Sequence, residues 1–427
     1  MDVHLHVLLH GLWGTTKHLE SASRVFSARH CRTDSKQQAP SDPELAIATE
    51  SNQVRIQLLS IEANQGSKTY DGIDWSAERA VEEIRESIRE MSSKGDRVVK
   101  FSITGYSLGG LCARYVVAIL YAQHFFDSVQ PVNFVTFATP HIGIPRIEGS
   151  LFSRISRYVG SRMLGSTGKQ LYWLDRWAGT TRPLLEIMAD KDLVFWKALD
   201  AFDNIDIYAN AIHDRMVPYL TGAFELSDPF KGQEDNLDIK FIPGYQPMME
   251  SWTPKDQSEG KTKRSLPERW EALKPLPLMG PFIQWDFPYN LIIIALMPII
   301  LAILVVLVPI IFVLNTRSSE QRVSILEKAS ASAQERLAQM FATLDYVGQD
   351  TGTTLEQKSQ GVSEGSLSEV QRKMIANLNK LSVRKHLTWI HPVRNSHAII
   401  ICREEKQYAG HGLGEGVLRH WADHFVS

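Results

Sequence analysis

The sequence predicts an α/β fold built on a mostly parallel central sheet, and three observations lead to it. Apolar stretches of strand length recur along the chain and alternate with stretches of helical periodicity. A serine between two glycines stands where one such strand meets a helix. Acidic and histidine residues follow that serine in the order that would bring them to one edge of a parallel sheet, where the sites of α/β proteins collect.

The serine lies in the motif Gly-Tyr-Ser-Leu-Gly at 105–109, between an apolar run and a run of helical spacing over 108–120. A serine at a strand-to-helix turn is the nucleophile elbow of α/β-hydrolases. Small residues at Gly105 and Gly109 let the neighbouring backbones approach, so that Ser107 can present its hydroxyl above the sheet edge. The alternative is a glycine-rich turn with a solvated serine.

The chain begins with an apolar strand at 3–9, which runs into the loop His-Gly-Leu-Trp-Gly at 10–14. In α/β-hydrolases the loop after an early strand supplies one N–H of the oxyanion hole, and the residue after the nucleophile supplies the other. We therefore expect the N–H groups of Leu12 and Leu108 to bind the oxyanion, with Gly11 in the turn. A plain turn without that role is the alternative.

A serine nucleophile needs a base, and the base needs a carboxylate that orients it. In α/β-hydrolases the chain order is Ser, then Asp or Glu, then His. The best acid candidate is Asp214, in the loop that follows an alternating strand at 205–210 and ends at Pro218. Asp206 and Asp203 are rivals, but the first lies within the strand and the second lies before it.

Several histidines late in the chain are candidates for the base. We choose His397, because it follows a strand at 386–390 and a loop with Pro392, as the histidine of an α/β-hydrolase follows its last strand. His391 is the runner-up, and His141 is expected to have a structural role at a loop rim. Three further histidines near a C-terminal helix are expected at the surface: His411, His420 and His424.

Five segments resemble the serine esterase family of eukaryotic lipases, and within it the fungal lipid-droplet phospholipases: 6–14, 104–114, 134–143, 208–218 and 396–398. The resemblance covers roughly 3–220 and 385–425. It implies an α/β-hydrolase fold, ester lipids as substrates, and a Ser-Asp-His triad on Ser107, Asp214 and His397.

Composition fits a folded intracellular enzyme, with 44% hydrophobic residues, 22% charged residues and a net charge of −2. This balance gives no reason to expect a nucleic-acid partner. Three cysteines (Cys31, Cys112 and Cys402) are too few for a disulfide scaffold and favour a reducing compartment. Histidines in the first apolar run are unlike a signal peptide.

At 427 residues the chain exceeds one typical domain, so we expect one hydrolase domain with insertions. The expected parts are a hydrolase core at 1–224, a polar linker at 225–284, a hydrophobic membrane segment at 285–316, an amphipathic helix and disordered linker at 317–384, and the completion of the core at 385–427. Within the first part we expect a polar insertion at 29–52 and, at about 146–182, an apolar and cationic lid over the site. An ordinary helical cap is the alternative to the lid.

The hydrophobic segment has no charge over residues 291–314. One helix of this length would measure about 36 Å, against a hydrocarbon core of about 30 Å. A single complete span would place Ser107 and His397 on opposite faces of the membrane. Because Pro298 and Pro309 each remove a helical hydrogen bond, we predict either a re-entrant hairpin or a helix lying in the interface. A lipid-droplet monolayer would suit such a segment.

Together these features predict a cytosol-facing serine lipase on the endoplasmic reticulum or a lipid droplet. It would hydrolyse glycerolipid esters, above all phospholipids, without a metal or an organic cofactor. Alternatives with the same chemistry are a triacylglycerol or small-ester hydrolase and a transacylase. An alternative from another class is a non-catalytic membrane scaffold on a hydrolase fold.

Overall fold

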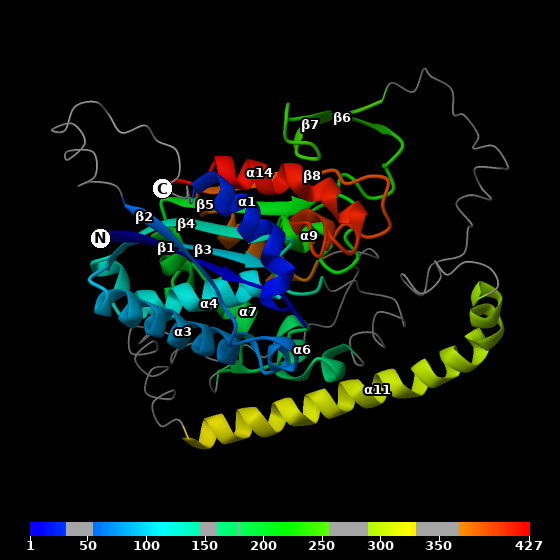
Figure 1. Cartoon of the computed structure of the whole chain (residues 1–427), viewed down its shortest axis with the longest axis horizontal. Coiled ribbons are helices and arrows are strands. Elements are labelled where there is room, and N and C mark those ends of the chain that lie inside the picture. The colour runs from blue at the N-terminus through cyan, green and yellow to red at the C-terminus, as the bar shows by residue number, and fades with distance from the viewer. Residues whose placement is uncertain (31–53, 146–159, 178–179, 256–288, 330–366) are drawn as a thin grey trace.

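A computed structural model describes residues 1–30, 54–145, 160–177, 180–255, 289–329 and 367–427. Its centre is a six-stranded sheet in the order β2-β1-β3-β4-β5-β8, in which each neighbouring pair is parallel (Figure 1). The strands are β1 (Asp2–Leu9), β2 (Arg55–Ser60), β3 (Arg97–Tyr106), β4 (Gln130–Phe137), β5 (Asn204–Asn210) and β8 (Val383–Thr388). The predicted α/β fold with a mostly parallel sheet is confirmed.

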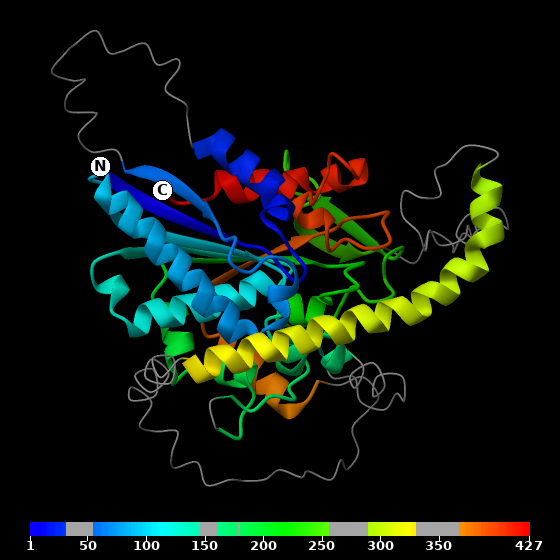
Figure 2. The same ribbon diagram turned by 60° about the horizontal axis from the view of Figure 1, so that its bottom comes forward.

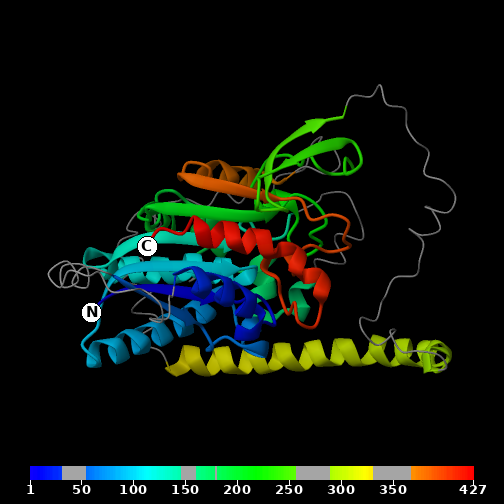
Figure 3. The ribbon, with the colours of Figure 1, turned by 45° about the horizontal axis from the view of Figure 1, so that its top comes forward.

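Helices cover both faces of the sheet, so its central strands β1, β3, β4 and β5 are buried at most positions. One face packs against α3 (Ile73–Ser93) and α4 (Leu108–Ala122), and the other against α1 (Glu20–His30) and α14 (Glu415–Asp423) (Figure 3). The alternation is clear along β1. Its odd-numbered residues from Val3 to Leu9 belong to the core cluster of α3 and α4, whereas Leu8 belongs to the cluster of α1 and α14.

The last part of the chain completes this sheet, as predicted for 385–427. Strand β8 pairs with β5 from Ile205 opposite Val383 to Asn210 opposite Thr388. The completion begins earlier than expected, because α13 (Glu369–Leu378) starts at a capping box of Ser368 and buries Met374 and Ile375 in the core.

Shorter helices on the body are α6 (Gly165–Leu171), α7 (Leu184–Met188), α8 (Val194–Asp200) and α9 (Tyr219–Gly222). The 3-10 turns are η1 (Thr16–Leu19), η2 (Gly66–Tyr70), η3 (Phe125–Asp127), η7 (Ile399–Ile401) and η8 (Ala409–Gly414).

The prediction of a linker at 225–284 was wrong for its first part. Strands β6 (Leu237–Phe241) and β7 (Met249–Pro254) form an antiparallel hairpin. The hairpin has a small core of its own, in which Leu237 and Met249 pack with Phe230 and Trp389. A polar average over the segment hides these widely spaced apolar residues.

The predicted lid is described only at 160–177 and 180–182. There, Leu171 and Trp177 are buried in the main core, while Leu174 is exposed. The lid stays a prediction, because 146–159 and 178–179 lie outside the described residues. The predicted insertion at 29–52 lies almost wholly outside them, as does most of the linker at 317–384.

The hydrophobic segment forms α11 (Tyr289–Ala329), one continuous helix with Pro298 and Pro309 inside it. Of the two predicted forms, the re-entrant hairpin was therefore wrong, because a helix can absorb a proline by bending rather than by breaking. The helix lying in the interface stays a prediction. Figure 1 shows the N-terminal end of α11 turning away from the line of the rest, and Figure 2 shows the helix running along the body. A stretch of 25 residues, Leu301–Ile325, is long and apolar enough to cross a membrane, by length and composition only.

Candidate active site

Ser107 lies at the turn between β3 and α4 with φ 55° and ψ −124°, a conformation that side-chain-bearing residues rarely adopt. Its N–H donates to the carbonyl of Phe137 at 2.8 Å, and the Thr139 hydroxyl donates to its carbonyl at 3.0 Å. These two bonds hold the strained turn in place. The predicted strand–serine–helix elbow is present.

The two glycines of the motif are required by close approach of the backbone. A Cβ at Gly105 would lie 2.4 Å from the Cα of Gly110. A Cβ at Gly109 would lie 2.4 Å from the carbonyl oxygen of Leu9, on the neighbouring strand. Larger residues would push α4 away from the sheet and displace the serine.

The structure brings three predicted residues together at the carboxyl ends of the strands. Nε2 of His397 lies 3.1 Å from Oγ of Ser107, although 290 residues separate them in the sequence. Nδ1 of His397 lies 3.0 Å from Oδ2 of Asp214. The His397 side chain is 9% exposed and the Asp214 side chain 1%, so both are largely shielded from water. In this arrangement the ring can donate to the carboxylate from Nδ1 and accept the serine proton at Nε2.

Neighbouring groups fix the carboxylate in this orientation. Oδ1 of Asp214 accepts the backbone N–H groups of Met216 at 2.9 Å and Val217 at 2.8 Å. Oδ2 accepts the side-chain amide of Asn210 at 2.8 Å. We had assigned no role to Asn210 from the sequence, although its place at the end of β5, four residues before Asp214, was a usable signal.

Tyr106, the residue before the serine, holds the backbone of His397 in place. The Tyr106 hydroxyl donates to the His397 carbonyl at 3.0 Å, and the two rings lie 5.2 Å apart. Burial raises the pKa of Tyr106. The phenol therefore stays protonated and remains a hydrogen-bond donor. Nothing in the sequence around Tyr106 or His397 indicates this contact.

The predicted oxyanion donors flank the serine. Leu108 is the first residue of α4, so its N–H has no partner within the helix. Leu12 follows Gly11, where a Cβ would lie 2.8 Å from the Cβ of Ser107. The loop that holds Leu12 (10–14) therefore passes directly against the serine. These two N–H groups are candidates for an oxyanion hole.

The alternative bases lie elsewhere. His391 pairs with His213, with Nδ1 and Nε2 of the two rings 3.1 Å apart. His141 is buried, with Nε2 3.0 Å from the Thr136 hydroxyl, which agrees with a structural role. The expectation that His420 lies at the surface was wrong. It is buried, with Nδ1 2.9 Å from the Tyr208 hydroxyl.

The rival acids are engaged in other pairs. Asp206 accepts bonds from Arg384 at 2.6 Å and His386 at 2.7 Å. Burial opposes ionisation of Asp206, but the bonds from His386 and Arg384 outweigh it and lower its pKa. Asp203 accepts the side-chain amide of Gln130 at 2.7 Å. Both rivals bond to groups other than His397, and Asp214 is the acid that the geometry favours.

The described residues contain no group of three His, Cys, Asp or Glu side chains that could hold a metal ion.

Two exposed apolar side chains lie close in sequence to residues of the site. Trp13, next to Leu12, is 44% exposed, and Met216, two residues after Asp214, is 51% exposed.

Comparison with known proteins relates the chain to a serine esterase family and to fungal proteins named as lipases. A family model described as "Putative serine esterase (DUF676)" matches residues 1–228, more than half of the 427 residues. "Putative lipase C4A8.10" of Schizosaccharomyces pombe is 30% identical over 182 residues, which are 42% of this chain and 23% of that protein. "Putative lipase ROG1" of Saccharomyces cerevisiae is 30% identical over 163 residues, which are 38% of this chain and 22% of that protein.

The chain thus spans about a quarter of the length of these curated relatives. Among solved structures, "Phospholipase PlaB from Legionella pneumophila in complex with thio-NAD" is 15% identical, with a TM-score of 0.29. That match covers 50% of this chain and 39% of the other. The matched family region contains Ser107 and Asp214, whereas His397 lies beyond it.

Proposed function

This chain belongs to the serine esterase family and is an ester hydrolase, and from that premise we propose that it is a lipase that cleaves the acyl esters of glycerophospholipids at a lipid surface. The observation that carries the proposal is the hydrogen-bonded series from Ser107 through His397 to Asp214. The apolar helix α11 supports the lipid surface as the place of action.

In the proposed mechanism, Nε2 of His397 takes the proton of Ser107 while Oγ attacks the acyl carbonyl carbon. Asp214 holds the ring tautomer and stabilises the imidazolium that forms. The N–H groups of Leu12 and Leu108 bind the oxyanion, an interaction for which each donor is worth about 100- to 1000-fold in rate. His397 then protonates the leaving alkoxide of the lysophospholipid. Water, deprotonated by the same ring, releases the fatty acid from the serine.

The surface of α11 supports lipid binding. Between positions 296 and 314 its described leucine, isoleucine and valine side chains are 38% to 62% exposed. Three are consecutive, Val306 to Val308, so they point in directions that cover more than half of the helix circumference. An apolar helix exposed on all sides is not stable in water and needs a covering. Lipid provides that covering without a specific protein groove.

The path of the chain supports one-sided insertion over a complete span. The sheet contains strands from before and after α11, so both must lie on one side of the membrane. A full crossing by α11 would require a second crossing, either before the helix within 256–288 or after it within 330–382. The longest uncharged runs there are 275–285, or 11 residues, and 337–344, or 8 residues, whereas a spanning helix needs about 20. We therefore propose that α11 lies within one leaflet, or in the monolayer of a lipid droplet, with the hydrolase domain in the cytosol.

The test is hydrolysis of phosphatidylcholine vesicles and of a soluble monomeric ester by the wild type and by Ser107→Ala. We expect Ser107→Ala to abolish both activities and to lose labelling by a fluorophosphonate, with an unchanged melting temperature. Retained hydrolysis would exclude Ser107 as the nucleophile. A panel with triacylglycerol and different phospholipid head groups then tests the substrate class, since faster cleavage of triacylglycerol would contradict the phospholipid assignment.

A further inference from the structure

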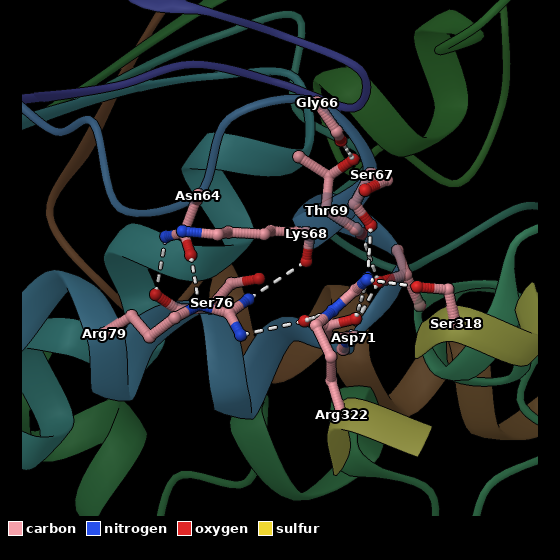
Figure 4. A network of polar contacts seen from close by, with 12 residues as sticks. Asn64, Gly66, Ser67, Lys68, Thr69, Asp71, Ser76, Arg79, Ser318 and Arg322 are labelled. Carbon is pink, nitrogen blue, oxygen red and sulfur yellow. Dashed lines mark hydrogen bonds and ion pairs between the residues drawn. The ribbon is translucent and has the colours of Figure 1, made fainter. Parts of the chain in front are cut away.

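A buried carboxylate joins α11 to the hydrolase body. Asp71, just after η2, has a side chain with no exposed surface and contacts two arginines from different helices. Arg322 of α11 donates to Oδ1 at 2.8 Å and to Oδ2 at 3.2 Å, while Arg79 of α3 donates to Oδ2 at 2.8 Å (Figure 4). Burial of a charge is costly unless it is paired and hydrogen-bonded, and here both oxygens are satisfied.

Further bonds fix the same part of α11. Arg322 also donates to the carbonyl of Ser67 at 3.0 Å, within η2. A bond of 2.7 Å to the hydroxyl of Ser318, one turn earlier in α11 itself, orients the guanidinium. Six residues before Arg322, the Thr316 hydroxyl lies 3.2 Å from the carbonyl of Arg162. These contacts come from residues 316–322, which we name the docking segment of α11. The apolar residues 296–314 precede this segment.

The 3-10 turn η2, which contacts the docking segment, also contacts the candidate oxyanion loop at 10–14. The N–H of Trp13 donates to the Thr69 hydroxyl at 3.1 Å, and its indole N–H donates to the Tyr70 hydroxyl at 2.7 Å. The Trp13 ring also lies 5.8 Å from the ring of Phe312, on α11. Since Trp13 follows Leu12 directly, η2 and α11 both contact the loop that borders Ser107.

The arrangement gives α11 a defined direction relative to the site. The strands end at the edge that carries Ser107, and Figure 3 shows the N-terminal part of α11 projecting beyond the body at that same end. A helix fixed at 316–322 holds its apolar part at the end of the body where the strands finish and Ser107 lies. A bidentate arginine suits this task because its planar fork fixes direction as well as distance.

We propose that Arg322 is a positioning residue for attack on lipid in a surface. Through Asp71 it holds α11 so that the site opens onto the leaflet that receives the apolar part of the helix. The inference rests on the proposed function and adds to it how the protein faces its substrate. Arg322 does not touch the reacting atoms, so a soluble ester reaches Ser107 without its help, whereas a lipid held in a leaflet does not.

Arg322 can be removed without leaving Asp71 unpaired, because Arg79 stays on the same carboxylate. Arg79→Gln is the matched control, since it removes the other partner of Asp71 but leaves the docking segment bound. Arg322→Lys keeps the charge and loses the fork. Each variant is assayed on phosphatidylcholine vesicles and on a soluble monomeric ester, and vesicle binding is measured by flotation.

For Arg322→Gln we expect soluble-ester hydrolysis and vesicle binding close to wild type. Hydrolysis of vesicle lipid should fall by about 10- to 100-fold, the loss typical of a reacting group displaced by about 1 Å. The rate of vesicle-lipid hydrolysis by Arg322→Lys should lie between those of the wild type and Arg322→Gln. Arg79→Gln should lower the melting temperature while keeping the ratio of vesicle to soluble activity. An equal loss on both substrates, no loss on either, or a loss of vesicle binding would each overturn the proposal.

A second measurement does not depend on activity. Hydrogen exchange of the vesicle-bound wild type should show slow amides in the docking segment, and Arg322→Gln should make them fast. Fast exchange in the bound wild type would mean that the contact opens on lipid, and it would refute the positioning role. Ser107→Ala should give the same exchange as the wild type. Failure of the proposed catalysis is thereby distinguished from failure of the positioning role.

Discussion

Asn210 and His397 share one oxygen of Asp214: the Asn210 amide donates to Oδ2 at 2.8 Å, and Nδ1 of His397 lies 3.0 Å from the same atom. The other oxygen accepts two backbone N–H groups. In Asp214→Asn the amide oxygen must face those N–H groups, so its NH₂ faces His397. The ring of His397 would then accept a hydrogen bond at Nδ1 and carry its proton on Nε2. Nε2 could no longer accept the proton of Ser107. We expect kcat to fall by about 10⁴-fold, the effect of a wrong tautomer in such a triad.

Asp206→Asn is the control for that substitution. It removes a buried carboxylate that pairs with Arg384 and His386, so it should lower the melting temperature. Because this cluster does not contact His397, kcat on a soluble ester should stay near the wild-type value. If Asp206→Asn lost as much kcat as Asp214→Asn, the assignment of the orienting acid would be wrong.

The identity of the base can be tested with two histidine variants. His397→Ala removes the only described ring that lies within hydrogen-bonding distance of Oγ of Ser107, and kcat should fall by about 10⁴-fold or more. His391→Ala breaks only the pair with His213, so kcat should stay close to that of the wild type. Burst kinetics with a chromogenic ester would measure both. The reverse order of effects would make His391 the base.

The candidate oxyanion loop can be displaced by one methyl group. In Gly11→Ala the new Cβ would lie 2.8 Å from the Cβ of Ser107 and 3.1 Å from the carbonyl oxygen of Tyr106. Either the loop at 10–14 or Ser107 must therefore shift. We expect a loss of about 100- to 1000-fold in kcat, as for removal of one oxyanion donor. Gly410→Ala is the control, since a Cβ there meets nothing within 4 Å. Full activity of Gly11→Ala would argue against a role for Leu12.

The parts of the molecule that sequence reasoning predicted well have local patterns. The elbow at Ser107 and the alternating strand before Asp214 are readable over a few residues, and chain order then favours His397. The hairpin β6–β7 was missed because its apolar residues are sparse and its pairing is set by tertiary contacts. Sequence reasoning could not choose between a hairpin and a continuous helix at Pro298 and Pro309, because a bend and a break begin with the same lost hydrogen bond.

Contacts between residues far apart in the chain could not be predicted from the sequence. Asp71 and Arg322 are 251 positions apart, and nothing in either neighbourhood indicates the other. His420 was misplaced for a different reason. Histidine is usually polar and exposed, but a neutral ring with a hydrogen-bond partner, here Tyr208, can be buried at low cost.

Buried histidines make the stability of this protein depend on pH. Burial, with a smaller contribution from the charge of Lys100, lowers the pKa of His4 to about 3. Burial, followed by the charge of His386, lowers the pKa of His420 to about 4. Both rings are therefore neutral in the folded protein at pH 5, whereas in the unfolded chain, with a pKa of about 6.5, they are mostly protonated.

The unfolded state thus binds more protons than the folded state between pH 6.5 and 4, so the free energy of unfolding should fall as the pH falls through this window. At pH 5 the loss should be about 1–2 kcal/mol for each histidine, since one pKa unit corresponds to about 1.4 kcal/mol. Urea unfolding at pH 7 and pH 5 measures it. His420→Asn, which can keep a bond to Tyr208, and His4→Gln, which can keep one to Ser102, should each reduce the difference between the two pH values. An unchanged difference in both variants would mean that other groups cause the pH dependence.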